Sequence, residues 1–171
     1  MDNNLLIIGA GIYSLVAAEI AEDMRKFDRI DFIDDQTKIS ESGKAVIGTT
    51  KQLDQLLDGY NNVVVAIGNP QVRMDLISRL EQNGNCRIAT LISPRAYVSP
   101  SAQIGEGCII EPMAVVHSKC VLESGCLVSA GAVINHGSRC CSGAHIDCNA
   151  TVMGQSTVPQ NTKVCSGEVY G

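Results

Sequence analysis

Aromatic side chains are scarce in this chain of 171 residues, which contains no Trp, two Phe and four Tyr. A hydrophobic core must therefore be built from Val, Ile, Leu, Ala and Cys, and an apolar content of 45% is enough for one domain or two small ones. Basic residues are not in excess, because the formal net charge is −5. This balance argues against the concentrated basic face of a nucleic-acid-binding protein.

Long apolar runs are also lacking. No stretch reaches the roughly 18 apolar residues that a membrane-spanning helix needs. The opening residues, Met1 to Asn4, lack the positive charge of a secretion signal. We therefore expect a cytoplasmic protein that does not insert into membranes. Eight cysteines are present without a Cys-x-x-Cys pair, so neither a secreted disulfide framework nor a structural zinc site is expected.

Residues 1–94 alternate short apolar runs with amphipathic segments. Strands are expected at 5–8, 29–33 and 62–67, and helices at 14–21 and 73–82. Such alternation predicts a Rossmann-like parallel sheet with helices packed on it. Ligands of these sheets bind beyond the carboxyl ends of the strands. The residues expected at that edge are Gly9, Ala10, Gly11, Asp34, Asp35, Gly68 and Asn69.

The glycines at the first of these turns allow two interpretations. Gly9-Ala10-Gly11 between a strand and a helix can present backbone amides to a diphosphate. The pattern is not the complete dinucleotide fingerprint, because Ser14 stands where the third glycine belongs. Asp34-Asp35 can likewise belong to a ligand site or to an ordinary polar turn.

From residue 95 onward the sequence follows a period of six. Twelve consecutive hexads carry an apolar residue at one position: Val98, Ile104, Ile110, Val116, Leu122, Val128, Ile134, Cys140, Ile146, Val152, Val158 and Val164. Two residues earlier the side chain is always small: Ala96, Ala102, Cys108, Ala114, Cys120, Cys126, Ala132, Ser138, Ala144, Ala150, Ser156 and Thr162. This pattern predicts a parallel β-helix over residues 95–171, with three hexads in each coil and about four coils.

The same phase accounts for half of the cysteines. Cys108, Cys120 and Cys126 occupy the small inward position, and Cys140 replaces an aliphatic residue, so we expect buried thiols. Cys108 and Cys126 are one coil apart, at a strand spacing of about 4.8 Å, where a disulfide is conceivable. A reducing cytoplasm favours free thiols instead.

Taken together, these motifs resemble the sialic acid O-acetyltransferase (NeuD) type of sugar O-/N-acyltransferase, including enzymes that acetylate UDP-linked 4-amino-sugars of the bacillosamine route. The markers are Ile8-Gly9-Ala10-Gly11, Phe32-Ile33-Asp34-Asp35, Val65-Ala66-Ile67-Gly68-Asn69 with Arg73, Thr90-Leu91-Ile92-Ser93-Pro94, Ile134-Asn135-His136 and His145-Ile146. The resemblance spans nearly the whole chain. It implies a left-handed β-helix, a homotrimer, and acetyl-CoA as co-substrate.

The resemblance also implies roles for individual residues. His136 would be the general base that accepts a proton from the attacking amine or hydroxyl. His145, Gly154 and Ser166 would bind the acyl-CoA. A nucleotide-linked sugar would bind through residues of the first domain: Gly9, Ala10, Gly11, Tyr13, Asp34, Asp35, Gly68, Asn69 and Arg73.

Two features keep an alternative open. His136 is flanked by Asn135 and Gly137, where relatives usually carry an acid, and the sequence given stops at Gly171, earlier than relatives do. The alternative is a nucleotide-sugar-binding or assembly protein that has lost acyl-CoA chemistry. A zinc site formed by His117, His136 and His145 is not expected, because their spacing does not match that of β-helical carbonic anhydrases.

Overall fold

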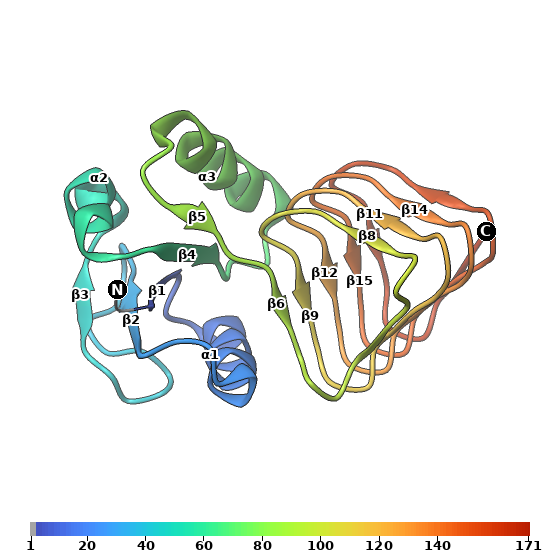
Figure 1. The fold of residues 1–171 in the computed structure, drawn as a ribbon, viewed down its shortest axis with the longest axis horizontal. Helices are drawn as coiled ribbons and strands as arrows, with labels where there is room; N and C mark the ends of the chain where they lie inside the picture. The colour runs from blue at the N-terminus through green and yellow to red at the C-terminus, as the bar shows by residue number, and fades with distance from the viewer. Residues whose placement is uncertain (1–2) are drawn as a thin grey trace. The chain divides into compact units, whose positions relative to one another are not determined.

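The computed structural model describes residues 3–171, which form two compact units that divide between Ala89 and Thr90 (Figure 1). The division falls before the boundary predicted at 94/95, because Leu91–Ile92 already pairs with the following coil of the β-helix. No helix among residues 3–171 is long and apolar enough to cross a membrane.

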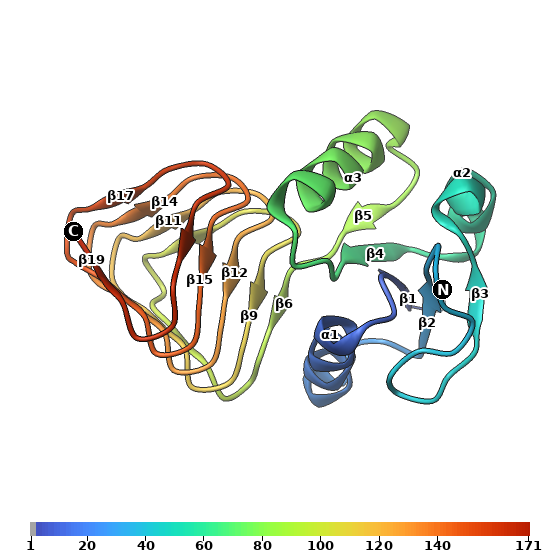
Figure 2. The same ribbon diagram turned by 180° about the vertical axis from the view of Figure 1, so that it is seen from behind.

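The N-terminal unit contains a five-stranded parallel sheet in the order β3-β2-β1-β4-β5. Its strands are β1 (Asn4–Ile8), β2 (Arg29–Ile33), β3 (Val46–Gly48), β4 (Asn62–Val65) and β5 (Arg87–Ile88). The helices are α1 (Ile12–Met24), α2 (Leu53–Leu56) and α3 (Pro70–Asn83), with 3-10 turns at Thr50–Gln52 and Leu57–Gly59. The helix α1 covers one face of the sheet, and α2 and α3 cover the other (Figures 1 and 2).

The sheet is buried on both faces, which explains its continuous apolar strands. Leu5 to Ile8 of β1 are all fully buried, and alternate residues of that strand face opposite layers. Leu6 and Ile8 join the core cluster that contains Ile77 and Leu80 of α3. The three predicted strands and two predicted helices are present, whereas β3, α2 and β5 were not anticipated, because their apolar runs are too short to show a period.

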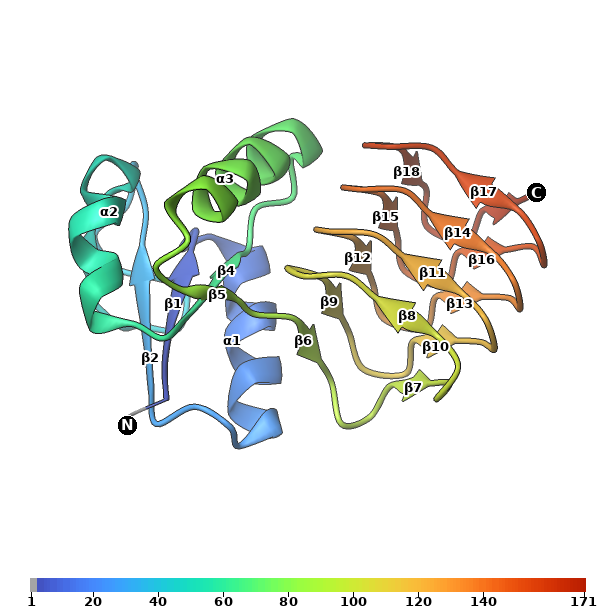
Figure 3. The same ribbon diagram turned by 45° about the horizontal axis from the view of Figure 1, so that its top comes forward.

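The C-terminal unit is a left-handed parallel β-helix whose strands each contain two residues. Within Thr90–Gly171, fourteen such strands form three sheets of five, four and five (Figure 3). The first sheet contains β6 (Leu91–Ile92), β9 (Ile109–Ile110), β12 (Leu127–Val128), β15 (His145–Ile146) and β18 (Lys163–Val164). The second contains β7 (Tyr97–Val98), β10 (Val115–Val116), β13 (Val133–Ile134), β16 (Thr151–Val152) and β19 (Val169–Tyr170). The third contains β8 (Gln103–Ile104), β11 (Val121–Leu122), β14 (Arg139–Cys140) and β17 (Thr157–Val158).

The predicted hexad phase is confirmed, because every one of the twelve apolar positions is the second residue of a strand and contacts the interior cluster. The repeat extends one hexad further at each end, through Ile92 and Tyr170, so the β-helix is longer than the predicted four coils. From Gly107 to Gly167, one corner of each hexad has a left-handed backbone, as at Gly131, whose φ is +71°. The positive φ favours glycine at this position, and a Cβ there would also force the Asn149 side chain of the next coil to move.

All eight cysteines are unbridged in the structure. Cys108, Cys120, Cys126 and Cys140 are fully buried in the β-helix interior, as the hexad phase predicted. Burial raises the pKa of the Cys140 thiol far above its usual range. These four side chains therefore act as small apolar residues rather than as reactive thiolates.

Candidate functional site

The loops after β1, β2 and β4 meet at the carboxyl edge of the N-terminal sheet. The first loop passes very close to the third, since a Cβ on Gly9 would lie 2.9 Å from the carbonyl oxygen of Ala66. Gly9 also has a φ of +110° and donates its N–H to the carbonyl oxygen of Ile33. Glycine is needed here for both reasons, and it brings the predicted binding loops together.

Asp34 and Asp35 are bonded to the backbone of their own unit. Asp34 Oδ2 accepts the N–H of Ala10 at 3.0 Å, and its Oδ1 accepts the N–H groups of Gln36 and Thr37 at 2.7 and 3.1 Å. Asp35 accepts Oγ1–H and N–H of Thr50 at 2.7 and 2.8 Å. The Thr50 hydroxyl, followed by its N–H, holds the pKa of Asp35 below its usual range. Both carboxylates stabilise turns of the chain, and their role in ligand binding stays a prediction.

Arg73 differs from the expectation that it contacts a ligand directly. Its side chain is 0% exposed, and Nη1 donates to the carbonyl oxygens of Ile67 and Gly68 at 2.8 and 2.9 Å. Asn69 caps the N-terminus of α3, with Oδ1 accepting the N–H of Val72 at 3.1 Å. Together these side chains fix the β4–α3 loop from inside the unit.

At this edge, two glycines leave the backbone exposed, whereas the polar side chains described above are hydrogen-bonded within the unit. A Cβ on Gly11 or Gly68 would meet no atom within 4 Å, so both glycines border open space. Gly11 precedes α1, and the partly buried Tyr13 lies in its first turn. Ser14 is buried and donates its hydroxyl to the carbonyl oxygen of Gly11. The N-terminal end of a helix at this place suits a phosphate, because its partial positive charge favours anions.

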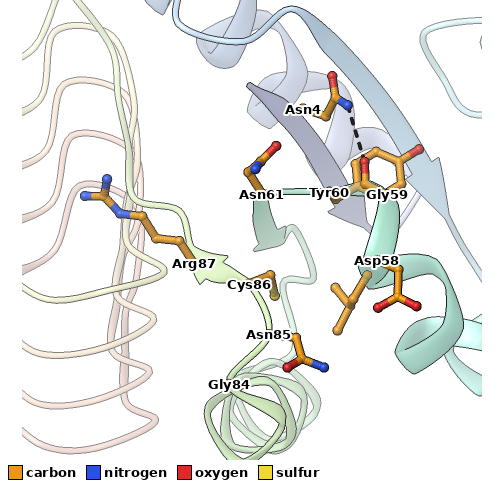
Figure 4. Close-up of a pocket in the computed structure, with 10 residues that line it drawn as sticks. Asn4, Asp58, Gly59, Tyr60, Asn61, Gly84, Asn85, Cys86 and Arg87 are labelled. Carbon is orange, nitrogen blue, oxygen red and sulfur yellow. Dashed lines mark hydrogen bonds between the residues drawn. The ribbon is translucent and has the colours of Figure 1, made fainter. Parts of the chain in front are cut away.

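A cavity of about 890 Å³ lies at the opposite, amino edge of the same sheet (Figure 4). Its lining consists of Asn4, Leu57, Asp58, Gly59, Tyr60, Asn61, Gly84, Asn85, Cys86 and Arg87. None of the predicted site residues belongs to it. Burial raises the pKa of the Cys86 thiol, so this cysteine is not activated as a nucleophile.

In the β-helix, His136 follows β13 and is exposed, as its position in the hexad predicted. Gly154 lies one coil later against the imidazole. A Cβ at Gly154 would come within 3.0 Å of His136 Cε1 and 3.2 Å of Nε2. Within residues 3–171, no hydrogen bond is made by the Gly154 N–H. The structure thus brings together two residues that were assigned different roles.

Sequence reasoning left His117 without a role. Its ring centroid is 6.3 Å from that of His136, with the two ring planes at 74°. The sequence did contain a signal for this contact: His117 and His136 are separated by 19 residues, which is one coil plus one residue and places them on neighbouring coils. No metal-binding cluster of His, Cys, Asp or Glu is found in the described part of the chain.

His145 belongs to a separate polar group on the sheet of β12, β15 and β18. Its Nε2 lies 3.0 Å from Ser129 Oγ and 3.8 Å from Asp147 Oδ1. Lys163 Nζ is 2.8 Å from Asp147 Oδ2, and this interaction is the main reason that the pKa of Asp147 is lowered to about 2. The exposed Ser166 side chain also contributes to lowering the pKa of Asp147.

Models of two families match the chain. Residues 4–80 match the PglD N-terminal domain, and residues 101–136 match the bacterial transferase hexapeptide repeat. A curated relative, UDP-N-acetylbacillosamine N-acetyltransferase of Bacillus subtilis, is 36% identical over 107 residues. That match covers 61% of this chain and 49% of the relative, so it spans only about half the relative's length.

Solved structures match over nearly the whole chain. The acetyltransferase domain of PglB from Neisseria gonorrhoeae, in complex with acetyl coenzyme A, has a TM-score of 0.87 and 31% identity, with 98% of this chain and 90% of that chain covered. A histidine-to-asparagine variant of perosamine N-acetyltransferase from Caulobacter crescentus, in complex with CoA and GDP-perosamine, has a TM-score of 0.83 and 25% identity, with 99% and 89% covered. The chain therefore belongs to the hexapeptide-repeat sugar acyltransferase family that joins a PglD-type N-terminal domain to a left-handed β-helix.

Proposed function

We propose that this protein transfers an acetyl group from acetyl-CoA to an amino group of a nucleotide-linked sugar, with His136 as general base. The observation that carries the proposal is the exposed His136 imidazole, which lies against Gly154 on the β-helix. The whole chain supports it through 31% identity, over 98% of its length, to an acetyltransferase domain solved with acetyl coenzyme A. The amino acceptor follows the relatives, which are named N-acetyltransferases of UDP- and GDP-linked sugars.

The geometry suits proton removal during amine attack. The amine nitrogen attacks the thioester carbon, a C–N bond forms, and His136 accepts the proton that the nitrogen must lose. The C–S bond then breaks, and the proton passes to the departing thiolate to give coenzyme A. In the tetrahedral intermediate, the unbonded N–H of Gly154 would donate to the oxyanion. No metal takes part in these steps.

The two substrates would bind to different units. The nucleotide-sugar would bind at the carboxyl edge of the N-terminal sheet, where Gly11 and Gly68 border open space and where the start of α1 would face a phosphate of the ligand. The acyl-CoA would bind along the β-helix near His145 and Ser166. Asp34, Asp35 and Arg73 would support the nucleotide-sugar loops without contacting the ligand.

We further propose a homotrimer in which the sheet of β7, β10, β13, β16 and β19 faces a second copy. The outward residues of this sheet are Tyr97, Val115, Val133, Thr151 and Val169, and the two terminal ones are 55% and 66% exposed. An apolar ladder of this kind, next to His136, is typical of a protein interface. Eight unbridged thiols fit a location in the reducing cytoplasm.

Purified protein incubated with acetyl-CoA and a UDP-linked 4-amino-sugar tests the proposal, with GDP-perosamine as a second acceptor. We expect coenzyme A release above the thiol background of Cys148 and Cys165, together with an acetylated sugar in the mass spectrum. Resistance of the product to hydroxylamine would identify an amide, and sensitivity would identify an ester and O-transfer. Binding of the UDP-sugar without coenzyme A release would favour the non-catalytic alternative, which the missing acid beside His136 supports.

A further inference from the structure

A second imidazole lies against the proposed base. The rings of His117 and His136 are in an edge-to-face arrangement, with centroids 6.3 Å apart and planes at 74°. This separation is within the range of roughly 4.5–7 Å in which aromatic pairs attract one another. Both side chains are exposed, so the contact is made at the surface where a substrate would approach.

Inter-coil hydrogen bonds fix the backbone beneath both rings. The N–H of His117 donates to the carbonyl oxygen of Ile134 at 2.9 Å, and the carbonyl oxygen of His136 accepts the N–H of Gln155 at 3.0 Å. The N–H of Gly137 donates to Ser118 at 2.9 Å. The relative position of the two histidines is therefore set by the β-helix ladder rather than by a loose loop.

The His136 ring lacks the polar partner that usually orients a histidine base. Among the described residues, no side chain is hydrogen-bonded to this imidazole. The amide of Asn135 is turned toward the backbone, where Nδ2 donates to the carbonyl oxygen of Val152 at 3.2 Å. Gly137 has no side chain. The edge contact with His117 and the close surface of Gly154 limit the ring's rotation.

We infer that His117 is a positioning residue for His136 and takes the place of the missing acid. A general base must hold one ring nitrogen toward the nucleophile, and elsewhere a carboxylate bonded to the other nitrogen does this. Here the imidazole of His117 restricts the ring by packing. The inference rests on the proposed role of His136, but it assigns a function to a residue that the family motif does not include.

Steady-state kinetics of His117→Ala, His117→Phe, His136→Ala and the exposed control Gln103→Ala test this assignment. His117→Ala should lose about tenfold in kcat, with KM for acetyl-CoA and for the acceptor changed by less than about twofold, because misorientation affects the chemical step. His117→Phe keeps an aromatic edge and should recover most of the loss. Gln103→Ala should match the unmodified protein.

A spectroscopic measurement separates positioning from a general structural effect. The Cε1–H resonance of His136 should shift in His117→Ala through loss of the ring current, while the backbone amide spectrum beyond neighbouring coils stays unchanged. An unchanged kcat in His117→Ala beside an inactive His136→Ala would overturn the positioning role. A raised acceptor KM at constant kcat would also overturn it, since His117 would then bind substrate. Activity retained in His136→Ala would instead refute the proposed function.

Discussion

In the N-terminal unit, the polar side chains at the edge of the sheet are bonded to the chain's own backbone, whereas in the β-helix the principal histidine stands exposed and is limited by packing. Arg73 is fully buried and Asp34 accepts three backbone N–H groups, whereas the exposed imidazole of His136 lies against His117 and Gly154. The difference shows that polar side chains predicted for one site can have different roles. A side chain that is hydrogen-bonded to the backbone fixes the shape of a binding loop, whereas a side chain without such bonds remains available to react.

The largest expected effect comes from removing the exposed histidine of the β-helix. His136→Ala should lower kcat by about 10³-fold, because general-base catalysis contributes roughly 10²–10⁴-fold. Stability should hardly change, since the side chain is exposed. The measurement is the rate of acetylated-sugar formation, with thermal melting as the control. A rate within threefold of the unmodified protein would contradict the assignment.

The next effect concerns the N-terminal unit and acts through stability. Arg73→Leu removes two hydrogen bonds to the carbonyl oxygens of Ile67 and Gly68, and leaves these groups unsatisfied. We expect a loss of about 3 kcal/mol in the free energy of unfolding of this unit, together with weaker UDP-sugar binding. Urea titration followed by far-UV circular dichroism checks the loss. The exposed Arg87→Leu is the matched control, and equal stability of both variants would refute the role of Arg73.

A smaller effect tests the packing that restrains His136. In Gly154→Ala, the new methyl group would lie within 3.0 Å of His136 Cε1, so the ring must turn away. We expect kcat to fall about tenfold while KM and the melting temperature stay nearly constant. The control is Gly59→Ala, because a Cβ at Gly59 would meet no neighbouring atom and its φ is not positive. Gly167→Ala is unsuitable because the φ of Gly167 is +71°. Full activity of Gly154→Ala would contradict the prediction, since it would show that Gly154 does not restrain the His136 ring.

The smallest effect is a pH dependence of β-helix stability. The pKa of Asp147 is lowered to about 2, first by Lys163, so its contribution is present above the ordinary pKa of 3.8 and is lost as pH falls toward 2. Because Lys163 is half exposed, we expect a contribution of only about 1 kcal/mol. Asp147→Asn should therefore be less stable at pH 7 but should lose less on acidification. Denaturation curves at pH 7 and pH 3 provide the measurement, and parallel losses in both proteins would contradict it.

The β-helix could be predicted almost residue by residue, because each hexad places side chains of the same size at the same interior positions. The interior accepts an aliphatic residue at positions such as Val98 and Val164, and only a small one two residues earlier. The ends were less predictable. Ile92 lies in the motif at the domain junction and Tyr170 breaks the aliphatic rule, so the repeat was placed one hexad short on each side.

The N-terminal unit was predictable only where its elements are long. The strand at Leu5–Ile8 and the helix around Ile77 carry clear apolar patterns, and both are present. The two-residue β5 and the four-residue α2 are too short for any period to emerge, and tertiary packing decides them. The candidate positions at the sheet edge were identified correctly as a group of loops, but their partners were not visible in the sequence.

By itself, the sequence determined the two fold types and the exposed placement of His136. Both follow from local patterns, namely strand–helix alternation and a period of six. Tertiary structure decided what each candidate touches. It buried Arg73 under its own loop, bonded Asp34 to a distant turn, and set His117 against His136 from the neighbouring coil. These outcomes depend on contacts between residues far apart in the chain, and no local pattern records them.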